Sequence, residues 1–82
     1  MKLEVLGPSC AKCNKLYEAT KEAVQKAGVT AEVTKVSDLA QIMKYGVLST
    51  PALVIDGKVV CAGRIPKTHE IVTWIVNAAA AQ

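Results

Sequence analysis

The spacing of apolar residues changes twice in the first part of the chain, and each change marks a structural element. Residues 3–6 and 31–36 are short segments in which apolar and polar side chains alternate, as in half-buried β-strands. Between them, apolar residues recur three or four positions apart, as on the inner face of an amphipathic helix. That face comprises Leu16, Ala19, Ala23 and Ala27. We predict a strand, a helix from Cys10 to Ala27 capped by Ser9 and Gly28, and a second strand.

The middle of the chain predicts a short helix followed by a hairpin. Residues 38–41 resemble a capping box, which opens a helix that ends at Gly46. Farther on, Asp56-Gly57 separates two apolar runs, residues 52–55 and residues 58–62. An Asp-Gly pair between apolar runs is typical of a tight β-hairpin.

The last segment favours a helix with Pro66 in its first turn. The apolar face of this helix comprises Ile71, Trp74, Ile75 and Ala78. The predicted order is therefore β-α-β-α-β-β-α. Its first three elements imply two parallel strands joined by a right-handed crossover. We predict a single α/β domain over residues 1–82, with a four-stranded mixed sheet flanked by three helices.

Composition and charge argue against several classes of partner. The net charge is +3, and the lysines are mixed with glutamates rather than gathered in a basic stripe, which argues against nucleic acid binding. The longest uncharged stretch, residues 71–82, contains polar residues and is too short to cross a bilayer. No secretory signal is visible, because Met1-Lys2 leads directly into the first strand. We expect a cytoplasmic protein with no membrane partner.

Two of the three cysteines form a Cys10-Ala11-Lys12-Cys13 motif at the predicted start of the first helix. A close pair of this kind, without an export signal, is typical of catalysis or metal binding. Backbone amides and the helix dipole at a helix N-terminus stabilise a thiolate, which is the reactive form of cysteine. We expect exposed Cys10 to attack a partner's disulfide and buried Cys13 to resolve the mixed disulfide. Lys12 either stabilises the thiolate or is an ordinary solvated lysine.

Three motifs, in the same order along the chain, resemble those of the small thioredoxin-like redox-active disulfide proteins of archaea and bacteria. They are residues 7–13 (GPSCAKC), residues 46–57 (GVLSTPALVIDG) and residues 63–66 (GRIP). The resemblance covers nearly the whole chain and implies a shortened thioredoxin fold. It implies a thiol–disulfide oxidoreductase that reduces protein disulfides without a cofactor or bound metal. A thioredoxin-reductase-like electron donor, or a small thiol, would restore its dithiol.

The resemblance also implies a substrate-binding segment outside the cysteine motif. Pro51 would be a cis-proline facing the active disulfide, and Thr50 would supply backbone groups that hold the partner peptide. Gly63 would permit a close backbone approach near the active site. We therefore expect Thr50, Pro51 and Gly63, with Lys12, to line the substrate-binding surface.

Glu4 has two interpretations. It alternates with apolar residues in a predicted central strand, where a carboxylate is costly unless it is satisfied. It stands six residues before Cys10, and within the resemblance this position matches the buried acid that assists proton transfer in thioredoxins. On that interpretation Glu4 acts through a water as the base for Cys13. Alternatively, it lies at an edge or an exposed position and pairs with a lysine.

Two other functions compete with disulfide reduction. A binding module would carry a soft metal or arsenite between Cys10 and Cys13, with or without Cys61. However, two thiolates leave a tetrahedral zinc site incomplete, and Pro8 stands where small copper chaperones carry methionine. An interaction domain with a vestigial disulfide is disfavoured because the cysteine motif is intact. Cys61 is either a small buried hydrophobe or a third reactive thiol.

Overall fold

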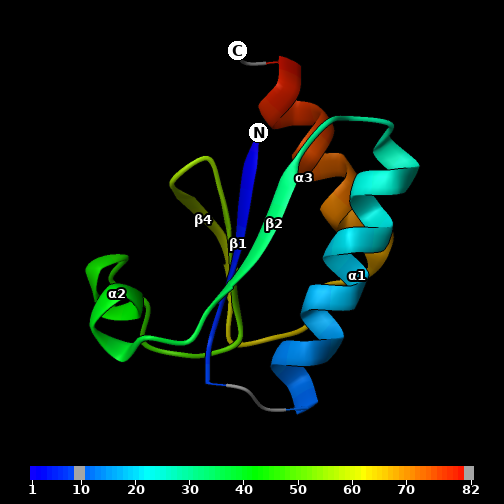
Figure 1. Ribbon diagram of the computed structural model, residues 1–82. Coiled ribbons are helices and arrows are strands. Elements are labelled where there is room, and N and C mark those ends of the chain that lie inside the picture. Colours follow the sequence, from blue (N-terminus) through cyan, green and yellow to red (C-terminus); the bar gives the residue numbers. More distant parts are fainter. Residues whose placement is uncertain (9–10, 81–82) are drawn as a thin grey trace.

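The computed structural model describes residues 1–8 and 11–80, and this part of the chain contains four strands and three helices (Figure 1). Their order along the chain is β-α-β-α-β-β-α, which confirms the predicted succession. The elements are β1 (Lys2–Leu6), α1 (Ala11–Ala27), β2 (Glu32–Val36), α2 (Leu39–Lys44), β3 (Ala52–Ile55), β4 (Lys58–Ala62) and α3 (Thr68–Ala80).

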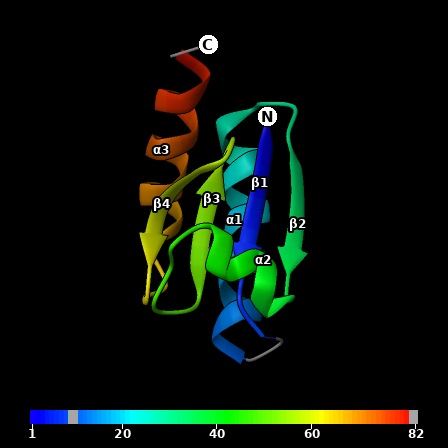
Figure 2. The same ribbon diagram turned by 90° about the vertical axis from the view of Figure 1, so that its left-hand side faces the viewer.

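The four strands form one mixed sheet in the order β2-β1-β3-β4 (Figure 2). Strand β1 runs parallel to β2, where Leu3 lies opposite Val33, and antiparallel to β3, where Leu3 lies opposite Ile55. Strand β4 pairs antiparallel with β3 and closes the hairpin. Strand β1 is therefore internal, and its carboxyl end leads into the cysteine motif.

The helices cover both faces of the sheet, as predicted. Helices α1 and α3 pack side by side on one face, and α2 lies on the other (Figure 1). Successive side chains of a strand point to opposite faces, so the residues of β1 are divided between two core clusters, one on each face of the sheet. Leu3 and Val5 join the larger cluster with Leu16 of α1 and Ile71 of α3. Leu6 joins the smaller cluster, which also contains Ile42, Ala52 and Val54.

The hairpin between β3 and β4 has the bounds that the sequence predicts. Asp56 and Gly57 both have positive φ angles, 49° and 83°, as the two central residues of a type I′ turn require. The turn is also tied to β1. The Asp56 amide donates to the Lys2 carbonyl, and the Lys2 amide donates to Asp56 Oδ1, each over 2.8 Å. The Asp-Gly pair thus fixes both the hairpin and its register against the sheet.

Local signals also set the ends of the first two helices. Asp38 caps α2, because its side chain accepts a hydrogen bond from the Ala40 amide at 3.0 Å. Gly46 follows the end of α2 with a φ of 71°, and Gly28 follows the end of α1 with a φ of 69°. Both are left-handed positions that glycine adopts without steric cost.

Four predicted boundaries are wrong by one or two residues. Strand β1 begins at Lys2 rather than Leu3, and α2 ends at Lys44 rather than at Gly46. Strand β2 begins at Glu32 rather than Ala31. Helix α3 begins at Thr68, so Pro66 precedes the helix instead of lying in its first turn. The reason is local: the side chain of Glu70 accepts a hydrogen bond from the Lys67 amide, a donor that proline lacks. Within the described residues, no helix combines the length and apolarity needed to span a bilayer.

The inner face of α1 also differs from the prediction. Its buried residues are Cys13, Leu16, Thr20 and Ala23, whereas Ala19 and Ala27 are only half-buried. Thr20 is fully buried because its hydroxyl donates to the Leu16 carbonyl at 2.7 Å. A satisfied hydroxyl can enter a core at little cost, so the polar residue occupies an inner position.

Candidate redox site

The candidate site begins where β1 ends and α1 starts. Ser9 and Cys10 lie outside the described residues, so their expected roles as helix cap and nucleophile stay predictions. Cys13 lies in the first turn of α1 and is 4% exposed, which confirms that this cysteine is buried. Lys12 beside it is exposed. The described first turn of α1 therefore contains a buried sulfur at Cys13 and a solvated cation at Lys12.

Gly7 brings the sulfur of Cys13 against the backbone that follows β1. A methyl group at Gly7 would lie 2.5 Å from Cys13 Sγ and 3.4 Å from the Thr50 Cβ. The φ angle of Gly7 is +153°, which side chains of L-residues rarely adopt. Its amide donates to the Val36 carbonyl at 2.9 Å, which ties this turn to the end of β2. Glycine at position 7 thus lets the sulfur and the segment containing Thr50 approach each other.

Thr50 and Pro51 lead into β3 on the other side of Gly7. The peptide bond between them is cis, the conformation that the resemblance implies for Pro51. Pro51 is fully buried, whereas Thr50 is exposed. The segment is therefore anchored by its proline and presents the residue before it to solvent.

Gly63 holds this segment from the side of β4. Its amide donates to the Pro51 carbonyl at 2.9 Å, and a methyl group at Gly63 would lie 3.0 Å from the Ser49 Cβ. The φ of Gly63 is +82°, so the position favours glycine for conformation as well as for space. Gly7 and Gly63 thus bring Cys13, Thr50 and Pro51 into one cluster at the end of the sheet.

Glu4 lies elsewhere on β1. It is half-buried on this internal strand, and the Tyr45 hydroxyl donates to its Oε1 at 2.9 Å. The interpretation as an edge or exposed residue paired with a lysine is therefore wrong. Glu4 alternates with the core residues that face α1, so its side chain lies on the α2 face of the sheet. Its role as a base for Cys13 stays a prediction.

The hydrogen bond between Tyr45 and Glu4 perturbs the tyrosine. The hydrogen bond that the Tyr45 hydroxyl donates to Glu4, its burial, and the negative charge of Glu4 together raise the pKa of Tyr45 above its usual value of 10.0. No sequence pattern indicates this pair, because the two residues are 41 positions apart and only the packing of α2 joins them.

Cys61 is buried in the larger core cluster, as expected of a small hydrophobe. Its sulfur lies 3.9 Å from the Arg64 carbonyl oxygen, a weak contact. Among residues 1–8 and 11–80, no three side chains of the kinds that bind metals converge on one point.

Arg64 and Glu70 form an ion pair that the sequence analysis also missed. Arg64 Nη1 lies 3.3 Å from Glu70 Oε1, and Arg64 Nη2 lies 3.1 Å from Oε2. The hydrogen bond to Arg64, and then that from the Lys67 amide, lower the pKa of Glu70. The same pairing raises the pKa of Arg64. The sequence does place an arginine and a glutamate on either side of Pro66, which is a weak signal for an ion pair. Helical spacing rules do not apply across a loop, so this signal does not identify the pair.

Comparison with known proteins decides the family. The family model described as "Thioredoxin domain" matches residues 1–76. The chain belongs to this thioredoxin-domain family. The matched region contains every element from β1 to β4 and most of α3, so the family assignment rests on almost the entire fold.

Two curated archaeal relatives agree with this assignment. A thioredoxin of Methanocaldococcus jannaschii is 39% identical over 69 residues, which cover 84% of this chain and 79% of the relative. A thioredoxin of Methanothermobacter thermautotrophicus is 35% identical over 71 residues, which cover 87% of this chain and 92% of the relative. These relatives support a thioredoxin-like redox function, and neither supports the metal-carrier alternative.

Proposed function

We propose that this chain is a thiol–disulfide oxidoreductase that reduces protein disulfides through Cys10 and Cys13. The observation that carries the proposal is the position of the Cys13 sulfur. It is buried against Gly7, beside the exposed Thr50 of the Thr50–Pro51 segment. In the proposal, the thiol of Cys10, three residues earlier in the sequence, is the one that meets the incoming substrate.

In the proposed reaction, the Cys10 thiolate attacks one sulfur of the substrate disulfide. A bond forms between Cys10 and that sulfur, and the other substrate sulfur leaves as a thiolate and takes up a proton. The Cys13 thiol then loses its proton and attacks Cys10 Sγ, which releases the second substrate thiol and closes the Cys10–Cys13 disulfide. Two electrons pass to the substrate. An electron donor of the thioredoxin reductase type, or a small thiol, returns the pair to the dithiol.

Burial of Cys13 suits the resolving step. A sulfur shielded from solvent cannot readily attack an external disulfide, but it suits attack on a bond formed at Cys10, three residues earlier in the sequence. In the proposal, the dipole at the N-terminus of α1 favours the thiolate at Cys10. Lys12, exposed in the same turn, adds positive charge near the thiols.

Substrate binding is proposed at the Thr50–Pro51 segment. Thr50 is exposed, and in the proposal its backbone pairs with an extended peptide that carries the disulfide. Gly63 braces the segment through its hydrogen bond to Pro51. Glu4 stays a candidate base for Cys13, acting through a water.

The test is the reduction of insulin disulfides by dithiothreitol, followed by turbidity. Wild type should accelerate precipitation, and Cys10→Ser should reduce the rate to that of dithiothreitol alone. The matched control is Cys61→Ala, which removes a buried cysteine outside the motif and should keep the wild-type rate. Equal rates for wild type and Cys10→Ser would end the proposal.

A trapping experiment separates the two cysteines. Cys13→Ser should accumulate a mixed disulfide with the substrate, because attack proceeds and resolution fails. Cys10→Ser should accumulate none. Stoichiometric Cu(I) binding by a wild type that exchanges no disulfides would instead support a carrier.

A further inference from the structure

The loop from residue 63 to residue 67 joins β4 to α3 and touches the Thr50–Pro51 segment at its first residue. Gly63 makes both contacts, the hydrogen bond to Pro51 and the close approach to Ser49. Displacement of Gly63 would therefore move the segment or break its brace. Any contact that holds this loop in place therefore also holds the Thr50–Pro51 segment in place.

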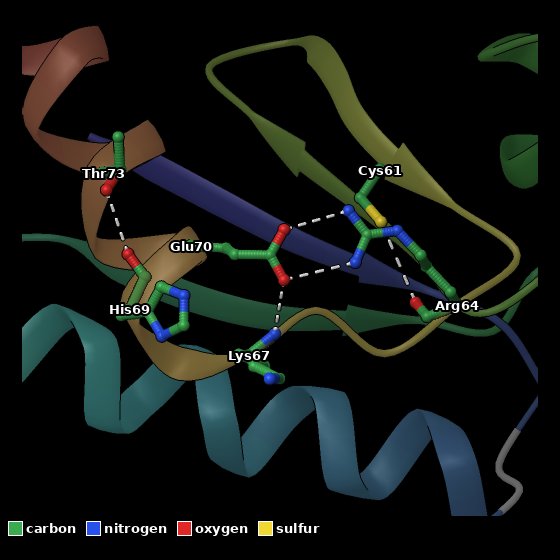
Figure 3. Close-up of polar contacts among 6 residues, drawn as sticks. All are labelled: Cys61, Arg64, Lys67, His69, Glu70 and Thr73. Carbon is green, nitrogen blue, oxygen red and sulfur yellow. Dashed lines mark hydrogen bonds and ion pairs between the residues drawn. The ribbon is translucent and has the colours of Figure 1, made fainter.

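The carboxylate of Glu70 fixes the loop at two points (Figure 3). Both its oxygens accept hydrogen bonds from the Arg64 guanidinium, and Oε1 also accepts one from the Lys67 amide at 3.1 Å. The guanidinium fork matches a carboxylate in a planar, two-bond arrangement, which specifies orientation as well as distance. The Glu70 side chain is 31% exposed and that of Arg64 is 54% exposed, so the pair lies at the surface but is partly shielded.

Helix α3 provides the fixed support for this carboxylate. Ile71 directly follows Glu70, and both Ile71 and Ile75 are fully buried in the larger core cluster. The helix packs along α1, the helix that contains Cys13. The loop is thus tied, through α3, to the same support as the resolving thiol.

We propose that Arg64 and Glu70 are a positioning pair, which holds Gly63, and through it the Ser49–Thr50–Pro51 segment, in register with Cys13. The inference rests on the proposed function, because it assigns the pair to the docking of a disulfide-bearing peptide. In this role the pair acts on the position of the segment and not on the substrate or the reacting sulfurs. Their effect passes through one backbone hydrogen bond, from the Gly63 amide to the Pro51 carbonyl.

The first test measures that hydrogen bond directly. Arg64→Gln removes the fork and the charge, and the exchange rate of the Gly63 amide in D2O should rise by about tenfold, because local opening is easier. Arg64→Lys keeps a charge without the fork and should give an intermediate rate. The matched control is Glu22→Gln, which removes the surface ion pair between Glu22 and Lys26 (3.1 Å) within α1. It should leave Gly63 exchange unchanged.

The second test measures docking. For a protein disulfide substrate, Arg64→Gln should raise KM by about three- to tenfold, with kcat within about twofold, because docking changes and chemistry does not. Glu70→Gln, which keeps an acceptor for the Lys67 amide, should change KM in the same direction. Reaction of the dithiol with iodoacetamide should be unchanged in both variants.

The outcomes separate this inference from the proposed function. Unchanged Gly63 exchange in Arg64→Gln would overturn the inference even if the wild type reduces insulin normally. A lower thermal stability with unchanged KM would also overturn it, since a merely structural pair would behave in that way. A wild type that reduces no disulfides would overturn the proposed function and the docking role together, whatever the exchange rate shows.

Discussion

Gly7 leaves the space that the sulfur of Cys13 occupies. A methyl group at position 7 would lie 2.5 Å from Cys13 Sγ, far inside van der Waals contact, and the φ of +153° adds conformational strain. The sulfur is buried and belongs to a helix packed along its length, so it cannot withdraw freely. Residue 7 therefore sets the position of residue 13.

Gly7→Ala should destabilise the fold by about 1–3 kcal/mol, the usual cost of overpacking a tight interior. If Cys13 resolves the mixed disulfide as proposed, Gly7→Ala should also slow insulin reduction, because the Cys13 sulfur is displaced. Urea unfolding measures the loss of stability, provided that the m-value is the same in both proteins. Gly46→Ala is the control for conformation alone, since Gly46 has a φ of 71° with no atom near its Cβ position. Equal losses for the two variants would show that the contact with Cys13 contributes nothing.

The parts of the fold that the sequence predicts are those with a local physical cause. The Asp56-Gly57 turn needs two positive φ angles, and few residue pairs other than Asp-Gly meet that need, so the hairpin strands are correct to the residue. The strand and helix periods likewise depend on near neighbours. The order of the elements, and with it the mixed sheet, therefore follows from residue patterns alone.

The missed features depend on partners that are distant along the chain or on satisfied polar groups. Thr20 enters the core because its hydroxyl bonds to Leu16, which a count of apolar residues cannot register. Glu4 meets Tyr45 across 41 positions, and Arg64 meets Glu70 across a loop. Tertiary packing creates these contacts, and no repeat or spacing rule encodes them.

The hydrogen bond between Tyr45 and Glu4 predicts a shift in the titration of Tyr45. The pKa of Tyr45 is raised chiefly because its hydroxyl donates to the Glu4 carboxylate, so Glu4→Gln should lower that pKa toward 10.0. The chain has two tyrosines, so phenolate absorbance is followed in a Tyr17→Phe background. As a control, Glu32→Gln on β2 removes an exposed carboxylate and should leave the pKa of Tyr45 unchanged.

The sign of the associated stability change follows from the raised pKa. The native state holds the phenol proton more tightly than the unfolded state, so the contribution is fully present below the unfolded pKa of about 10. It is lost as the pH rises through the folded value. A Tyr45 titration that does not move when Glu4→Gln is introduced would contradict the assignment of this shift to Glu4.

Cys61 serves as packing in the larger core cluster, so its removal should affect stability rather than chemistry. Cys61→Ala should lose about 1 kcal/mol or somewhat more, as expected when a buried side chain loses a heavy atom. Cys61→Ser, which places a hydroxyl in an apolar site, should be at least as destabilising. Chemical denaturation compares the variants, and insulin reduction should continue in both. Loss of activity in folded Cys61→Ala would instead point to a third reactive thiol.

The ion pair between Arg64 and Glu70 predicts how Glu70 titrates. Its pKa is lowered, first by the hydrogen bonds from Arg64 and then by the one from the Lys67 amide. Arg64→Gln should therefore raise the pKa of Glu70 toward its usual value, although not fully, because the Lys67 amide still donates. The carboxyl carbon shift of Glu70, followed by NMR through the acid range, measures this pKa in both proteins.

The lowered pKa of Glu70 also fixes the direction of its pH-dependent contribution to stability. The unfolded state binds this proton more tightly than the native state, so the contribution is present above the unfolded pKa of about 4.3. It is lost as the pH falls through the folded value. The difference in unfolding free energy between wild type and Glu70→Gln should accordingly shrink on acidification. A difference that stays constant across the titration would mean that the charge of Glu70 does not stabilise the loop, and that only its capping of α3 does.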